Sequence, residues 1–193
     1  MIKLTIIGVK GVHIMKNQRK VLGEERREML LQLLKDKGEP ITGSELASIT
    51  NVSRQVIVGD ITLLKAKGEP IIATSQGYML LIQNSGQAPM VERIIASSHS
   101  PERTEEELNL LVDYGITVKD VRIEHPVYGD LTASVMVSNR KEVSQFMKKI
   151  KSTNASYLSE LTGGIHLHTI SAATTEKLDE AEKALKQANF LIQ

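Results

Sequence analysis

The sequence predicts an α+β protein in two parts, a helical part that ends in a β-hairpin and a two-layer α/β sandwich on an antiparallel sheet. Its 193 residues, 41% hydrophobic and 24% charged, are typical of a folded globular chain. Helical periodicity dominates before Gly68, whereas strands and helices alternate after Met90. The polar segment IQNSGQAP separates the two patterns. We therefore expect an N-terminal arm at 1–20, a first domain at 21–82, a linker at 83–89 and a second domain at 90–193.

Charge divides the chain in the same place. The formal net charge is only +1, but residues 1–85 hold 12 Lys and Arg against 8 Asp and Glu, and residues 86–193 hold 12 against 15. The basic half suits nucleic acid, whereas four of the five histidines lie in the acidic half. No apolar run reaches the roughly 18 to 20 residues of a membrane span, and no signal peptide is visible. We expect a cytoplasmic protein with no membrane partner.

Three helices follow one another in the basic half. Met29, Leu30, Leu33 and Leu34 form one stripe of a helix over 24–37, which Gly38 ends. Thr42 and Glu45 have the spacing of a capping box that opens a short second helix with Leu46, Ala47 and Ile49 inward. Ser53 is a good N-cap for a third, in which Ile57, Ile61 and Leu64 recur at helical spacing. The tight turn at 51–52 makes the pair a helix-turn-helix.

Two short β runs at 71–73 and 78–81 surround a turn that contains Gly77, and this hairpin is the wing of a winged helix-turn-helix. The third helix places polar side chains where a recognition helix reads bases in the major groove, and Lys65 and the wing tip suit phosphates. The expected DNA contacts are Ser53, Arg54, Gln55, Val58, Lys65, Ser75 and Gln76. A packing module without DNA is the alternative. Gly59 either permits close approach of the DNA or is simply tolerated.

The first fourteen residues fit neither half. They form a strand or arm, or translation starts at Met15 and they are absent in the cell. His13 is accordingly interpreted as incidental and not as a ligand.

The acidic half alternates strands and helices. We expect strands at 90–97, 118–124, 131–137, 156–161 and 165–171, and helices at 101–115, 141–151 and 175–188. The strand pair at 118–137 is hairpin-like, so the sheet is antiparallel and the half is a two-layer sandwich.

The absence of cysteine removes disulfides and every thiolate metal ligand, so a metal here needs His, Asp or Glu. His166 and His168 project from one face of a strand, and His99 precedes a helix that carries Glu107 in its second turn. Such a set suits a divalent transition ion, and zinc, nickel, iron and manganese all remain open. Two histidines on a solvated strand face are the alternative.

Two resemblances bear on function. The segment ITGSELASITNVSRQVIVGDITLLKAKGEPI resembles the winged helix-turn-helix of bacterial regulators such as the biotin operon repressor. ASSHSPERTEEELNLLVDYG, VRIEHPVYGDL and ELTGGIHLHTI resemble the motifs of the three-histidine domain that follows a winged helix in bacterial niacin-responsive repressors. That resemblance implies a phosphocarrier-protein-like second domain and repression of NAD synthesis or niacin uptake genes with nicotinic acid as effector. It also implies metal ligation by His99, Glu107, His166 and His168, while His125 belongs to the remaining motif, with nickel or zinc the favoured ions.

Nicotinate has a carboxylate and a ring nitrogen, which suit an open metal position or a cation such as Arg103 or Arg122. Tyr128 is placed to cover the ring, and His125 is either a pocket residue or a residue that orients the loop. The leading hypothesis is a repressor that binds a two-fold operator as a homodimer, because one helix-turn-helix reads only a half-site.

Two other classes are weaker. A metal-dependent enzyme with a His and Glu site, fused to a DNA-binding domain, lacks support because no H-E-x-x-H, G-x-G-x-x-G or P-loop occurs and Ile170 stands where a His-x-His-x-Asp hydrolase needs Asp. A biotin-repressor-like ligase lacks its GRGRxxR segment. A purely structural dimerisation domain predicts that His166 and His168 are dispensable for metal content and for the effector response.

Overall fold

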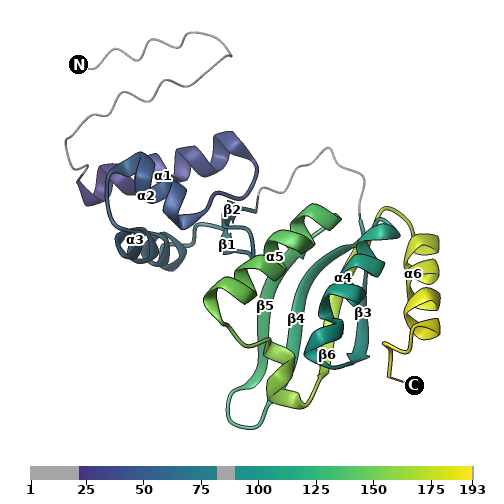
Figure 1. Ribbon diagram of the computed structural model, residues 1–193. Coiled ribbons are helices and arrows are strands. Elements are labelled where there is room, and N and C mark those ends of the chain that lie inside the picture. Colours follow the sequence, from purple (N-terminus) through teal and green to yellow (C-terminus); the bar gives the residue numbers. More distant parts are fainter. Residues whose placement is uncertain (1–21, 82–89, 193) are drawn as a thin grey trace.

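The structure is a computed structural model and describes residues 22–81 and 90–192, which form two bodies (Figure 1). The arm expected at 1–20 and the linker expected at 83–89 lie outside the described residues, as does His13. No helix in the described parts of the chain has the length and apolar character needed to cross a membrane.

The first body is a winged helix-turn-helix, as expected. Thr42 accepts the backbone N–H of Glu45 at 3.1 Å, and Ser53 accepts that of Val56 at 3.4 Å, so both predicted caps are present. Its elements are α1 (Gly23–Lys37), α2 (Gly43–Thr50), α3 (Arg54–Ala66) and the antiparallel wing strands β1 (Ile71–Ala73) and β2 (Tyr78–Leu80).

Leu30, Leu34, Ile57, Ile61 and Leu64 are buried in the core of this body. Met29 was expected on the same buried stripe of α1 but is 37% exposed. The face of α1 that packs against α3 is too narrow to bury all of the apolar residues of the helix.

A buried ion pair joins α1 to α3. Arg26 Nε donates to Asp60 Oδ2 at 2.6 Å, and Arg27 also contacts this carboxylate at 3.3 Å. Helical spacing of apolar residues gave no indication of this pair, since the charges belong to two separate helices.

The second body is a two-layer α/β sandwich. Its four strands are all antiparallel in the order β3-β6-β4-β5, and the three long helices lie over one face (Figure 1). The core fills the space between sheet and helices and includes Leu111, Ile170, Leu178 and Phe190. The elements are β3 (Val91–Ser98), α4 (Thr104–Asp113), β4 (Thr117–His125), β5 (Gly129–Val137), α5 (Arg140–Thr153), β6 (Ile165–Ala172) and α6 (Thr175–Gln187), with 3₁₀ turns η1 (Pro101–Arg103) and η2 (Leu158–Thr162).

The strand expected at 156–161 is wrong, because this segment contains the 3₁₀ turn η2. Its backbone groups bond locally, with Gly163 N–H donating to Glu160 at 3.3 Å and Gly164 N–H to Ser159 at 2.9 Å. Gly163 and Gly164 then adopt φ of 64° and 98° and turn the chain into β6. Apolar residues at 157, 158 and 161 resemble a strand pattern, but their backbone has no sheet partner to bond.

Candidate functional site

Four side chains of the second body meet at one carboxylate. His99 follows β3, Glu107 lies on α4, and His166 and His168 share one face of β6. The Nε2 atoms of His99, His166 and His168 lie 2.7, 3.4 and 3.3 Å from Glu107 Oε2. All four residues are buried, and Glu107 is 0% exposed. The resemblance had implied these four as a set, and the fold brings them together.

Each imidazole is also held by a hydrogen bond from its second ring nitrogen, Nδ1, to a backbone carbonyl. The Nδ1 atoms of His99, His166 and His168 face the backbone oxygens of Ser100, Gly164 and Asp120 at 2.8, 2.8 and 2.6 Å. A carbonyl only accepts, so Nδ1 carries the proton and Nε2 of a neutral ring presents a lone pair. Metal-ligating histidines in proteins are oriented in this way by a second hydrogen bond.

The centre of the cluster therefore requires positive charge. Three Nε2 lone pairs and a carboxylate oxygen converge, and without a proton or a cation between them they would repel one another. The second oxygen of Glu107, Oε1, is also buried and has no hydrogen-bond partner in the described structure. His99, Glu107 and His166 offer ligand atoms that all lie within 4.8 Å of one another. Three nitrogens and a carboxylate fit a divalent transition ion, so this cluster can hold a metal.

The pKa shifts of the cluster residues are consistent with a site for a cation. Burial alone would raise the pKa of Glu107, but the charge on His168 and the hydrogen bonds from the three imidazoles hold it well below its usual range. Burial lowers the pKa of His99 and of His168, and the contacts with Glu107 outweigh this and raise both. Glu107 is thus ionised, and a bound cation would compete with protons for the imidazoles.

Local backbone geometry builds the cluster. The register of β4 shifts after Val118, and Asp120 there offers its carbonyl to His168 and its carboxylate to the N–H of Thr169 at 3.0 Å. Gly164 passes so close to His99 that a Cβ would lie 2.3 Å from the His99 carbonyl oxygen. Sequence reasoning missed both residues. The Gly163–Gly164 pair beside the His-x-His motif could have indicated a close backbone approach at Gly164. The role of the Asp120 carbonyl could not have been predicted, because every residue has a backbone carbonyl.

The effector contacts expected at His125, Tyr128, Arg103 and Arg122 are not assembled into one site. His125 Nδ1 accepts the N–H of Tyr128 at 3.3 Å, and the two rings lie 5.0 Å apart in the β4–β5 turn, where Tyr128 is 74% exposed. The Arg103 guanidinium bonds Glu106 and stacks 4.0 Å from the Phe190 ring.

Arg122 lies on the face of the sheet away from the cluster. It pairs in register with Leu167, and strand alternation directs Leu167 opposite to its neighbours His166 and His168.

The expected DNA contacts divide into two groups. Ser53, Arg54 and Gln55 are exposed at the start of α3, Val58 follows one turn later, and Lys65 is exposed near its end. This is the arrangement that a recognition helix presents to a major groove.

The wing tip, in contrast, contacts the second body. Ser75 Oγ donates to the Val135 carbonyl at 2.5 Å, and Gln76 Nε2 donates to that of Met136 at 3.4 Å. The Lys149 amino group of α5 donates to the Ser75 carbonyl. In this arrangement Ser75 and Gln76 link the two bodies.

Comparison with known families assigns both bodies. Residues 26–79 match the model of an HTH domain, and residues 92–193 match that of the 3H domain. The HTH match covers α1 to the wing, and the 3H match includes all four residues of the cluster.

Two curated relatives align with this chain over nearly their whole length. The chain is 60% identical over 178 residues to the transcription repressor NadR of Bacillus subtilis, covering 92% of this chain and 99% of the relative. It is 39% identical over 174 residues to the probable transcription repressor NiaR of Thermotoga maritima, covering 90% and 97%. Both relatives are named as transcription repressors and neither as an enzyme, so the enzyme alternative is not supported.

Proposed function

The chain belongs to the niacin-responsive family of transcription repressors, and from that premise we propose that it represses genes of NAD synthesis or niacin uptake in response to nicotinic acid. The observation that carries the proposal is a winged helix-turn-helix with an exposed recognition helix joined to a buried His₃Glu cluster. One body would bind operator DNA, and the other would sense the effector in the cytoplasm.

The metal proposal names His99, Glu107, His166 and His168 as the residues that hold the ion. Nickel or zinc suits three imidazoles and a carboxylate best, and iron or manganese is compatible with the same set. When bound, the ion supplies a Lewis-acid position that a carboxylate or a ring nitrogen can take. The protein's part is to orient the three rings through their Nδ1 hydrogen bonds and to keep Glu107 ionised.

Operator recognition would rest on Arg54 and Gln55, whose side chains suit guanine and adenine edges in the major groove. Ser53, Val58 and Lys65 surround them on the exposed side of α3. A base contact of this kind contributes about 1–3 kcal/mol of discrimination.

A homodimer is supported by the second body as well as by the half-site argument. The face of the sheet opposite the helices carries Ile94 and Ile165, which are 55% and 54% exposed, with Leu167 beside them on the same face. Stacking two such faces would bury these side chains and fix two recognition helices on a two-fold operator. Sedimentation equilibrium of the wild type and of Ile94→Glu tests this, and an unchanged mass would contradict it.

The test of the proposed function is operator binding at fixed salt with and without nicotinic acid. Saturating nicotinic acid should change the affinity of metal-loaded protein about 5- to 150-fold, the usual range of allosteric coupling. Arg54→Ala should weaken binding, whereas Lys183→Ala, on the distant helix α6, should not. Affinity that is indifferent to nicotinic acid would refute the regulatory proposal, and an inert Arg54→Ala would refute the recognition helix.

A further inference from the structure

Helix α5 is a basic element in an otherwise acidic half of the chain. Residues 86–193 hold 12 Lys and Arg against 15 Asp and Glu, and α5 alone carries five of these basic residues and only one acidic residue. Arg140 at its start bonds Asp113. The lysines of its last turns, Lys148, Lys149 and Lys151, are exposed and have no ion-pair partner within residues 22–81 and 90–192. The end of α5 therefore presents positive charge that suits a polyanion.

This basic end lies against the DNA-binding body. Lys149 donates to the Ser75 carbonyl at the wing tip, and it lines one pocket together with Arg54 of the recognition helix. Burial and then the charge of Arg54 lower the pKa of Lys149, as expected when two like charges approach each other. Figure 1 shows α5 on the side of the second body that faces the wing strands. A cation of the second body thus stands beside a residue that is expected to read bases.

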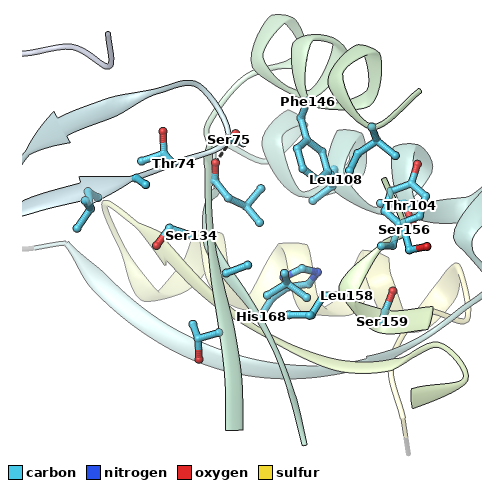
Figure 2. Close-up of a pocket in the computed structure, with 18 of the residues that line it drawn as sticks. Thr74, Ser75, Thr104, Leu108, Ser134, Phe146, Ser156, Leu158, Ser159 and His168 are labelled. Atoms are coloured by element: carbon cyan, nitrogen blue, oxygen red, sulfur yellow. Dashed lines mark hydrogen bonds between the residues drawn. The ribbon is translucent and has the colours of Figure 1, made fainter. Parts of the chain in front are cut away.

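The contact between the two bodies is built into the backbone of β5. The register between β4 and β5 shifts beyond Val118, where Val135 and Met136 of β5 lie opposite a single residue of β4, and Met136 adopts a φ of 52°. Such a bulge interrupts the ladder and leaves backbone groups of the bulged strand without a partner in it. Ser75 and Gln76 donate to the carbonyls of Val135 and Met136, and Figure 2 shows the bond of Ser75 as a dashed line. The wing tip is therefore held to β5, which keeps α5 beside α3.

We propose that the basic end of α5 is a second DNA-contact surface, in which Lys149 binds a backbone phosphate next to the base pairs that α3 reads. The inference rests on the proposed function, since it takes operator DNA as the polyanion. With Ser75 and Gln76 held to β5, the phosphate contacts expected of the wing tip come from the second body instead.

Two properties separate such a contact from base reading. A phosphate contact carries no sequence information, so it strengthens binding to the operator and to unrelated duplex alike. It also releases counterions, and each neutralised phosphate contributes about −0.9 to the slope of log affinity against log salt concentration. Lys149 should therefore contribute to the salt dependence of binding, and Arg54 to its specificity.

Binding of the full-length protein to two short duplexes tests the surface. One duplex is selected by the wild type from a random library, the other has the same composition in scrambled order, and both are titrated from about 50 to 200 mM salt. Lys149→Gln keeps a donor for the Ser75 carbonyl but removes the charge. Its slope should become shallower by about 0.9 for each protomer bound, and at about 0.15 M salt its affinity should fall about fivefold per lost contact on both duplexes.

Three further variants isolate the charge at position 149. Lys149→Arg keeps it and should bind as the wild type. Lys183→Gln removes an exposed lysine of α6, which lies on the far side of the second body from the wing (Figure 1), and should leave the slope unchanged. Arg54→Ala should instead lower the preference for the selected duplex over the scrambled one.

The possible failures are distinguishable. A wild type that selects no sequence would overturn the inference together with the repressor function. A wild type that selects one while Lys149→Gln keeps its full salt slope would overturn the inference alone. Equal losses in Lys149→Gln and Lys149→Arg would assign Lys149 to anchoring the wing, and a loss confined to the selected duplex would assign it to base reading; either result would also overturn the phosphate contact.

Discussion

The stability that metal binding adds to the second body should rise with pH, whereas the stability of the metal-free second body should fall. The pKa values of His99 and His168 are raised above the ordinary 6.5, after a lowering by burial, by their contacts with Glu107. In metal-free protein this stabilisation is complete below pH 6.5 and is lost as pH rises through the raised values. The pKa of Glu107 is lowered, so the stability that its ionised form contributes is present above its ordinary pKa of 4.5. This contribution therefore does not change across the pH window in which the two histidines titrate.

The ion requires the same rings to be neutral. Binding then releases up to two protons, so in the window where both rings are charged the metal affinity should rise with pH by about 2.7 kcal/mol per unit, twice the 1.36 kcal/mol of one proton. The increase in metal affinity should level off once the pH exceeds the raised pKa values of His99 and His168. For a domain of this size each kcal/mol shifts the midpoint about 4–8 °C.

Thermal unfolding from pH 5.5 to 8.5, with and without a saturating divalent ion, measures how the stability of the metal-free protein and the stability gained from metal each depend on pH. The metal-free midpoint should fall across the window while the gain from metal increases. His125→Gln removes a histidine outside the cluster and should change neither slope, whereas Glu107→Gln should remove the metal effect. A metal gain that is independent of pH, or that persists in Glu107→Gln, would refute the reasoning.

Three further changes test the structure around the two sites. Asp60→Asn removes the buried carboxylate that Arg26 and Arg27 share, and it should lower the free energy of unfolding in urea by about 3–5 kcal/mol. The exposed Asp36→Asn should lower it little, and equal effects of the two changes would contradict a stabilising role of the buried ion pair. Gly59→Ala meets open space on α3 and should stabilise the protein by up to about 1 kcal/mol with operator affinity kept; lost affinity would instead indicate close DNA approach. Gly164→Ala should lower metal content by displacing His99, which metal analysis of the purified variant checks, and a full metal content would contradict the tight contact.

Helices and strands with strong local signals were predictable from the sequence. The caps at Thr42 and Ser53 and the period of Ile57, Ile61 and Leu64 are local features, and the structure confirms them. The segment at 156–161 failed because its apolar residues fit a strand, while the glycines that follow it turn the chain away from the sheet.

The site was predictable where a side chain carries the chemistry. His99, Glu107, His166 and His168 are recognisable by residue type and resemblance, and the fold unites them. The role of the Asp120 carbonyl was not predictable, because it depends on an irregularity in the register of β4 that the sequence does not indicate.

The contact between the wing and the second body was also hidden. Ser75 and Gln76 are polar residues at a hairpin tip, a pattern that suits phosphates equally well. Only the tertiary arrangement places them against the edge of β5.

We propose that the His₃Glu cluster and the recognition helix are coupled through nicotinic acid. Operator affinity at fixed salt, titrated with nicotinic acid in metal-loaded wild type and in Glu107→Gln, tests it most directly. Nicotinic acid should shift the operator affinity of the wild type at least about fivefold and should leave that of Glu107→Gln unchanged. Equal responses of the two proteins, or no response in either, would contradict it.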